Sequence, residues 1–211
     1  MWTVLLMNLA GLLSPGPDFF YVSRKAASDT HRNAVAGAFG IALGILFWSA
    51  VVIFGLAMIN RTNNLVQYII MCLGGSYLAY CGIKMLRVTE NAQLADFTQT
   101  KAKHSSIFRE VMKGLLINVS NAKVIVFFSS VLSGLMANIS GNTEIVLVIV
   151  LLALETFLYF TLIVFFFSRK IVRTFYNRYN RYIDNLAGIV FVFFGGELIY
   201  SGLSTIICLT A

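Results

Sequence analysis

Charged residues are scarce in this chain of 211 residues. Asp, Glu, Lys and Arg make up only 12% of it, whereas hydrophobic residues make up 58%. A chain of this length is too short to bury so much apolar surface in a water-soluble core. The shortage of charge therefore excludes an ordinary soluble domain and indicates an integral membrane protein.

Cysteine is also rare. Cys72, Cys81 and Cys208 are an odd number without a CxxC pair, which argues against a disulfide framework or a zinc site. Free thiols packed among helices are the simpler interpretation. We expect a protein that needs no cofactor and is not an enzyme.

Apolar stretches account for most of the chain, and each is near the roughly 20 residues that a helix needs to cross the hydrocarbon. They cover residues 2–23, 35–58, 65–86, 111–136, 143–168 and 184–207. The sequence therefore predicts an all-α integral membrane protein with six transmembrane helices in a single domain, residues 1–211. No Lys or Arg precedes the first apolar run. This is not the charge layout of a cleaved signal peptide, so we expect the first stretch to be retained.

Basic residues are concentrated in alternate connecting segments. All but two of the 16 Lys and Arg residues lie in residues 24–32, 84–113 and 169–181. The positive-inside rule makes these segments cytoplasmic and both termini periplasmic. Tyr and Arg alternate in residues 173–182, a pattern that nucleic-acid binding could explain. An interfacial aromatic belt against anionic lipid explains it better, so we expect no nucleic-acid partner.

An internal repeat is indicated by two similar segments. Residues 74–82 of the third stretch match residues 195–202 of the sixth with one residue deleted. Because three crossings reverse the direction of the chain, the two halves would form a 3+3 inverted repeat. Chance similarity between glycine-rich helices is the alternative. The halves would be residues 1–86 and 111–211, joined by a polar cytoplasmic linker over residues 87–110.

Four ionisable residues fall well inside the apolar stretches: Asp18, Lys123, Glu155 and Glu197. A charge at the centre of a membrane helix costs roughly 2.5 to 3.5 kcal/mol on insertion scales, so it persists mainly where it faces protein or water. These residues are therefore the first candidates for a functional site.

A break is predicted in the first helix. Pro15 and Pro17 remove two backbone donors, and Gly16 permits dihedral angles that a helix does not use. A helix restarting near Pro17 would point its free amides and positive dipole end into a cavity, which suits a substrate carboxylate. Asp18, which follows Ser14 to Pro17, is explained equally well as the cap of this restarted helix.

Polar residues occupy the corresponding place in the second half: Asn118, Ser120, Asn121 and Lys123. Their side chains could cap a local break or form hydrogen bonds between helices. If the repeat is correct, Asp18 and Lys123 would meet near the membrane midplane. A buried pair costs less than either charge alone.

Two segments resemble a known family. Residues 14–23, SPGPDFFYVS, resemble the first-span signature of the LysE/RhtB amino-acid exporters, and most closely their threonine exporter branch. Residues 114–123, GLLINVSNAK, resemble the second signature, in which an Asn-Pro-Lys triplet is usual. Ala122 stands where the family has proline, which puts the second helix break in question. The resemblance extends over essentially the whole chain.

The resemblance implies a proton-driven secondary exporter of neutral L-amino acids, threonine-like or homoserine-like, in a bacterial inner membrane. Alternating access would expose the site to each side in turn. The partners would be the amino acid, protons and membrane lipid, and a homo-oligomer is left open. Glu155 and Asp18 would be the proton-coupling candidates. The expected substrate-binding residues are Ser14, Pro15, Gly16, Pro17, Asp18, Asn118, Asn121 and Lys123.

Two other classes of function remain. A divalent metal ion exporter could use the oxygen donors of Asp18, Glu155 and Glu197, although Lys123 would repel a cation. A transmembrane thiol redox protein is less favoured, because no cysteine adjoins the residues of either predicted break.

Overall fold

The computed structural model describes residues 2–62, 64–89, 106–136 and 141–210, and these residues are almost entirely helical. Most of the predicted linker, residues 90–105, lies outside the described residues. The helices are α1 (Trp2–Leu13), α2 (Pro17–Ser28), α3 (His31–Thr62), α4 (Asn64–Leu86), α5 (Ile107–Val119), α6 (Ala122–Met136), α7 (Asn142–Phe167) and α8 (Lys170–Thr210).

The number of spanning helices differs from the prediction of six. Among the described residues, α3, α4, α7 and α8 are long and apolar enough to cross a membrane, and the bent pair α5–α6 would make a fifth span. The predicted first span, residues 2–23, is instead divided into α1 and α2, with 12 residues each. Each piece is too short to cross alone, and α2 carries Asp18, Arg24 and Lys25.

Helix α8 begins earlier than predicted. It starts at Lys170 and includes the Tyr/Arg stretch, which the sequence placed in a connecting segment before residue 184. No glycine or proline occurs between residues 170 and 187, so nothing in the backbone chemistry stops the helix there. The connection from α7 is reduced to Ser168 and Arg169.

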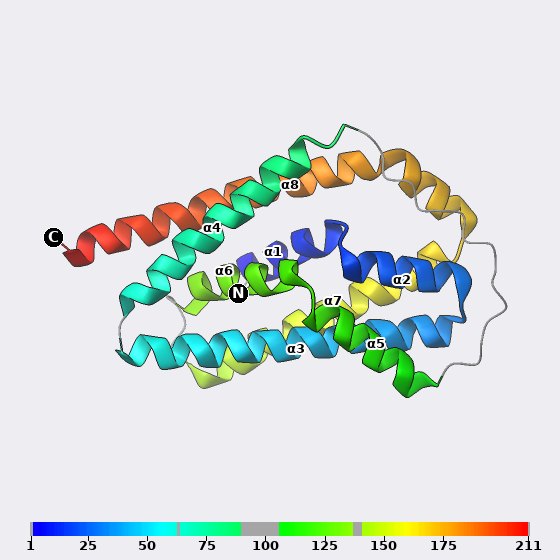
Figure 1. Cartoon of the computed structure of the whole chain (residues 1–211), viewed down its shortest axis with the longest axis horizontal. Helices are drawn as coiled ribbons and strands as arrows, with labels where there is room; N and C mark the ends of the chain where they lie inside the picture. The colour runs from blue at the N-terminus through cyan, green and yellow to red at the C-terminus, as the bar shows by residue number, and fades with distance from the viewer. Residues whose placement is uncertain (1, 63, 90–105, 137–140, 211) are drawn as a thin grey trace.

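The helices form a layered bundle (Figure 1). Helices α4 and α8 lie side by side along one face, and α3, α5 and α7 form the opposite face. The short helices α1, α2 and α6 lie between them. The turns from α2 to α3 and from α7 to α8 lie at one end of the long axis, and the start of α4 and the C-terminus lie at the other.

Glycines let α4 and α8 pack closely. A Cβ atom added to Gly75 would lie 2.8 Å from the carbonyl oxygen of Gly195, and one added to Gly195 would lie 2.6 Å from that of Gly75. Gly82 and Gly188 make the same reciprocal contact, seven residues later in α4 and seven residues earlier in α8. Small residues at this spacing allow two backbones to approach. The glycines that drew attention to the repeat therefore serve helix packing.

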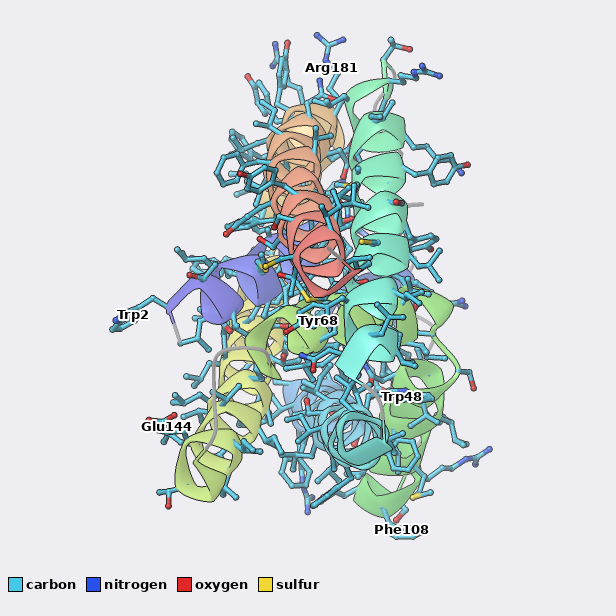
Figure 2. The ribbon with its side chains drawn as sticks, turned by 90° about the vertical axis from the view of Figure 1, so that its left-hand side faces the viewer. Trp2, Trp48, Tyr68, Phe108, Glu144 and Arg181 are labelled. Atoms are coloured by element: carbon cyan, nitrogen blue, oxygen red, sulfur yellow. The ribbon has the colours of Figure 1, made fainter. Side chains whose placement is uncertain are left out.

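The outer surface is strongly apolar. Large exposed side chains include Trp2, Phe54, Leu73, Phe193 and Tyr200. Figure 2, viewed from one end of the long axis, shows Trp2 projecting away from the helices. Water-soluble monomers rarely expose so much apolar surface, whereas lipid tails would cover it. The surface therefore fits the membrane location that the composition predicts.

A polar layer crosses the interior. One buried apolar cluster includes Ile41 of α3 and Phe160 of α7, and a second includes Ile45 and Ala153 of the same two helices. Thr156 lies between the two clusters along α7 and is fully buried. The helix breaks described next bring further polar groups to this layer.

Candidate functional site

The predicted break in the first helix is confirmed. Helix α1 ends at Leu13, and α2 begins at Pro17. Gly16 occupies the N-cap of α2 with φ −149° and ψ −175°, and no side chain caps it. Pro17 at the first helical position has the fixed φ angle that a helix start requires. The local chemistry of this motif was therefore sufficient to predict the break.

A second break is present although Ala122 replaces the family proline. Helix α5 ends at Val119, α6 begins at Ala122, and the two are bent by 65°. The side-chain oxygen of Asn121 accepts a hydrogen bond from the backbone N–H of Lys123 at 3.1 Å. This is the bond that an Asn N-cap makes. The start of the helix after the second break is therefore stabilised by a side-chain cap, whereas the start of the helix after the first break is stabilised by proline.

The two breaks engage each other reciprocally. Asp18 is the second residue of α2, and Lys123 is the second residue of α6. Asp18 Oδ2 accepts a hydrogen bond from Asn118, in the last turn of α5, at 2.8 Å. Lys123 Nζ donates to the carbonyl oxygens of Gly11 and Ser14, at the end of α1, at 3.0 and 2.8 Å. Each restarted helix therefore contacts the half-helix that precedes the other break.

The expected ion pair between Asp18 and Lys123 does not form. The structure describes both residues, and their charged atoms do not come within the 4.0 Å of a salt bridge. A helix continuing through Pro15 would bond the Gly11 carbonyl to the N–H of residue 15, which proline lacks. The Lys123 ammonium supplies that missing donor.

A pocket lies between the two breaks. It encloses about 40 Å³, and Asp18, Asn121 and Lys123 line it. Asp18 is 8% exposed, and its Oδ1 atom has no hydrogen-bond partner among the described residues. Lys123 uses two of the three donors of an ammonium group. The remaining lining residues are Asn8, Gly11, Leu12, Ser14, Gly16, Phe19, Ile45, Val124, Phe127, Phe128 and Phe160.

The other expected binding residues do not line this pocket. Asn118 is fully buried and holds the Asp18 carboxylate. A Cβ atom on Gly44 would lie 2.3 Å from Asn118 Oδ1, so the glycine is needed for the amide to fit. Pro15 lines a neighbouring pocket, and Pro17 begins α2. Asn118 and Pro17 therefore position Asp18.

Glu155 lies beside the pocket and not in it. It lines an open groove with α1 residues such as Trp2. Asn8, which lines the pocket, donates to Glu155 Oε2 at 3.0 Å and to Thr156 Oγ1 at 3.4 Å. Glu197 is exposed on α8 and lines neither this pocket nor the groove.

An ion-pair cluster ties α2 to α5 at the end that carries the basic segments. Glu110 is fully buried and pairs with Lys25 at 2.7 Å and Lys113 at 2.8 Å. Lys25 also pairs with Asp29. Burial alone would raise the pKa of Asp29, but hydrogen bonds from Lys25, Thr30 and Asn33 outweigh it and lower the pKa below its ordinary value. Asp29 therefore stays charged at neutral pH.

Three interior residues were missed in the sequence: Asn8, Glu110 and Asp184. Asn8 interrupts an apolar helix, which is itself a signal of a buried hydrogen bond. Asp184 stands four, seven and eleven residues before Gly188, Phe191 and Gly195. That spacing puts it on the helix face that packs on α4, and this signal could have found it.

Neither alternative class gains a site. No group of three or more His, Cys, Asp and Glu side chains is placed to hold a metal ion in the part of the chain that the structure describes. All three cysteines are free.

Comparison with known proteins gives a consistent result. The model of the LysE type translocator family matches residues 9–202. The chain belongs to this family. A threonine efflux protein of Salmonella typhi is 36% identical over 200 residues, 95% of this chain and 97% of that protein. The Escherichia coli threonine efflux protein is 34% identical over 94% and 97% of the two chains.

A further relative is more similar but carries no assigned function. An uncharacterized membrane protein of Haemophilus influenzae is 48% identical over 98% of this chain and 99% of its own length. No solved structure matches the chain. The family and its relatives identify a membrane translocator of the amino-acid efflux type, which is the family that the two signatures indicated.

Proposed function

We propose that the chain exports a small neutral L-amino acid, threonine or a close analogue, across the bacterial inner membrane in exchange for protons. The observation that carries this proposal is the pocket between the breaks. It offers a carboxylate and an ammonium group, each with unused hydrogen-bonding capacity, from opposite breaks. A zwitterionic substrate needs both.

The substrate's ammonium group would bind Asp18 Oδ1. Its carboxylate would bind the third donor of Lys123 and the free amides at the start of α2, where the helix dipole favours an anion. Phe127, Phe128 and Phe160 form much of the remaining wall. Small size and neutral side chains therefore suit the pocket.

Proton coupling is assigned to Glu155, with Asp18 as the second candidate. Glu155 reaches the pocket through Asn8, so a change in its protonation would change the hydrogen bonds that Asn8 offers there. Alternating access would follow from movement of the two broken helices relative to each other. The basic segments would face the cytoplasm and both termini the periplasm, by the positive-inside rule.

Efflux assays test the proposal. Cells are preloaded with a panel of labelled amino acids, and efflux is followed with and without a protonophore. We expect selective efflux of threonine-like substrates that the protonophore abolishes. Asp18→Asn should abolish efflux, whereas Glu197→Gln, the matched change at an exposed acid, should not. Equal efflux from cells with and without the protein, across the whole panel, would exclude the function.

A further inference from the structure

A second pocket adjoins the first on the other side of Lys123. It has a volume of about 300 Å³ and lies between the α1–α2 break and the α4–α8 pair. Ser14, Lys123 and Phe127 line both pockets. The second pocket therefore reaches the same ammonium group from a different direction.

Asp184 of α8 is the acid of this second pocket. Its residue is only 7% exposed, and its Oδ1 atom has no hydrogen-bond partner among the described residues. A buried carboxylate is costly unless it is paired or hydrogen-bonded. One oxygen of the Asp184 carboxylate therefore lacks a hydrogen-bond donor among these residues, and the ammonium group of a ligand would supply one.

Lys84 supplies the opposite charge. It lines the same pocket from α4, is exposed, and forms no salt bridge with Asp184 in the described structure. Tyr77, Leu78 and Phe191 provide the apolar wall. The chemistry of the first pocket is thus repeated here: one acid, one base and aromatic surface.

We propose that this second pocket is an access site for the transported amino acid. Asp184 binds the substrate's ammonium group and Lys84 its carboxylate, before Lys123 passes the carboxylate to the first pocket. The pocket lies towards the end of α4 that leads to Arg87, and Arg181 donates a hydrogen bond to the Thr89 carbonyl at 3.1 Å nearby. By the positive-inside rule this is the cytoplasmic side, from which an exporter loads. The inference rests on the proposed function.

Cys81 provides a direct probe, because it lines the second pocket and is a free thiol. With Cys72 and Cys208 replaced by serine, Cys81 is the only cysteine left. Its alkylation by N-ethylmaleimide is followed in the purified protein, with L-threonine and with each neutral L-amino acid that the cells export. An exported amino acid at about ten times its Kd should slow alkylation about tenfold by occupying the pocket.

Variants distinguish the second pocket from the first. Protection is measured for each variant as the ratio of its own alkylation rates without and with the amino acid, and in Asp184→Asn this ratio should fall to about one. Lys84→Met, at an exposed position where folding is not at risk, should also remove the protection. Glu197→Gln should keep full protection. Asp18→Asn should lose efflux and still show protection at Cys81.

The outcomes separate the two proposals. If the protein exports an amino acid that never protects Cys81, or protects it equally in Asp184→Asn and Lys84→Met, the access site is excluded and the exporter function stands. Loss of protection in Asp18→Asn would mean that protection comes from closure around the first pocket, which also overturns the access site. If no amino acid is exported, the proposed function itself fails.

Discussion

The two helix breaks reach the same result by different chemistry. The first uses Pro15, Gly16 and Pro17, and no side chain caps the helix that follows. The second contains no proline, and its restarted helix is capped by Asn121. Proline removes a backbone hydrogen-bond donor permanently. A capping side chain instead supplies an acceptor for a backbone N–H that the start of a helix leaves free.

The difference determines which partner each break needs. Proline leaves the Gly11 carbonyl without an intrahelical donor, and the Lys123 ammonium supplies one from the other half of the chain. The second break contributes an amide donor, Asn118, to an acid at the first. Each break therefore depends on a hydrogen bond from the other. Asp18 and Lys123, which take part in these hydrogen bonds, also line the pocket.

Removing the proline break should have the largest effect. In the triple variant Pro15→Ala, Gly16→Ala and Pro17→Ala, residue 15 regains the N–H that the Gly11 carbonyl lacks, so the helix can continue and release Lys123. We expect efflux to be abolished while the protein remains in the membrane, as measured by efflux and by immunoblot of membranes. Gly196→Ala is the control, because a Cβ atom there meets nothing within 4 Å. Normal efflux by the triple variant would show that the motif is only a tolerated kink.

The two charges should differ in their effect on stability. Lys123→Met leaves the carbonyls of Gly11 and Ser14 without their donor, which should lower the free energy of unfolding by about 1 to 3 kcal/mol. Asp18→Asn keeps an oxygen to accept the Asn118 hydrogen bond, so its loss should be about 1 kcal/mol or less. Thermal unfolding in detergent measures both.

The double variant tests whether the two residues meet. Asp18 and Lys123 line one pocket but bind different partners, so the coupling energy between the two changes should be about 0.5 kcal/mol, the lower end for residues that share a cavity. A larger coupling energy would show that they form an ion pair after all.

The sequence predicted what depends on local chemistry. Proline and glycine determine the backbone within a few residues, so the first break followed directly from residues 14–17. The second was harder, because Asn121 caps a helix only if the chain bends there. Asp184 was missed because it follows a basic Tyr/Arg stretch and resembles an interfacial residue. Its spacing to Gly188 and Gly195 puts it on one helix face, and the close packing of those glycines on α4 shows that this face is buried.

Contacts between residues far apart in the chain could not be predicted from local sequence patterns. Lys123 was expected to pair with Asp18, since both are charges buried at equivalent places. A local pattern does not reveal that carbonyl oxygens at the end of α1 compete for the ammonium. The Glu110 cluster joins residues about 85 apart in the chain, and no spacing rule connects them.

Removing the cap should weaken the second break moderately. Asn121→Ala deletes the hydrogen bond to the Lys123 amide, which should cost about 1 kcal/mol of stability. Lys123 would then be held less firmly against α1, so efflux should fall while folding persists. Asn121→Asp, which retains a capping oxygen, is the matched control for thermal unfolding and efflux. Equal stability of Asn121→Ala and the parent protein would mean that tertiary packing alone maintains the break.

Restoring the family proline should have the smallest effect. Ala122 is the first residue of α6, a position where proline is favoured because its N–H would be unused and its φ angle is already helical. Ala122→Pro should therefore raise the free energy of unfolding by about 0.4 to 1 kcal/mol, mainly by restricting the unfolded chain. Combined with Asn121→Ala, it should recover most of the lost stability, because proline and cap would then be interchangeable means of making one break. A destabilised Ala122→Pro protein would show that the second break depends on a backbone geometry that proline cannot adopt, and that the two breaks differ in shape as well as in chemistry.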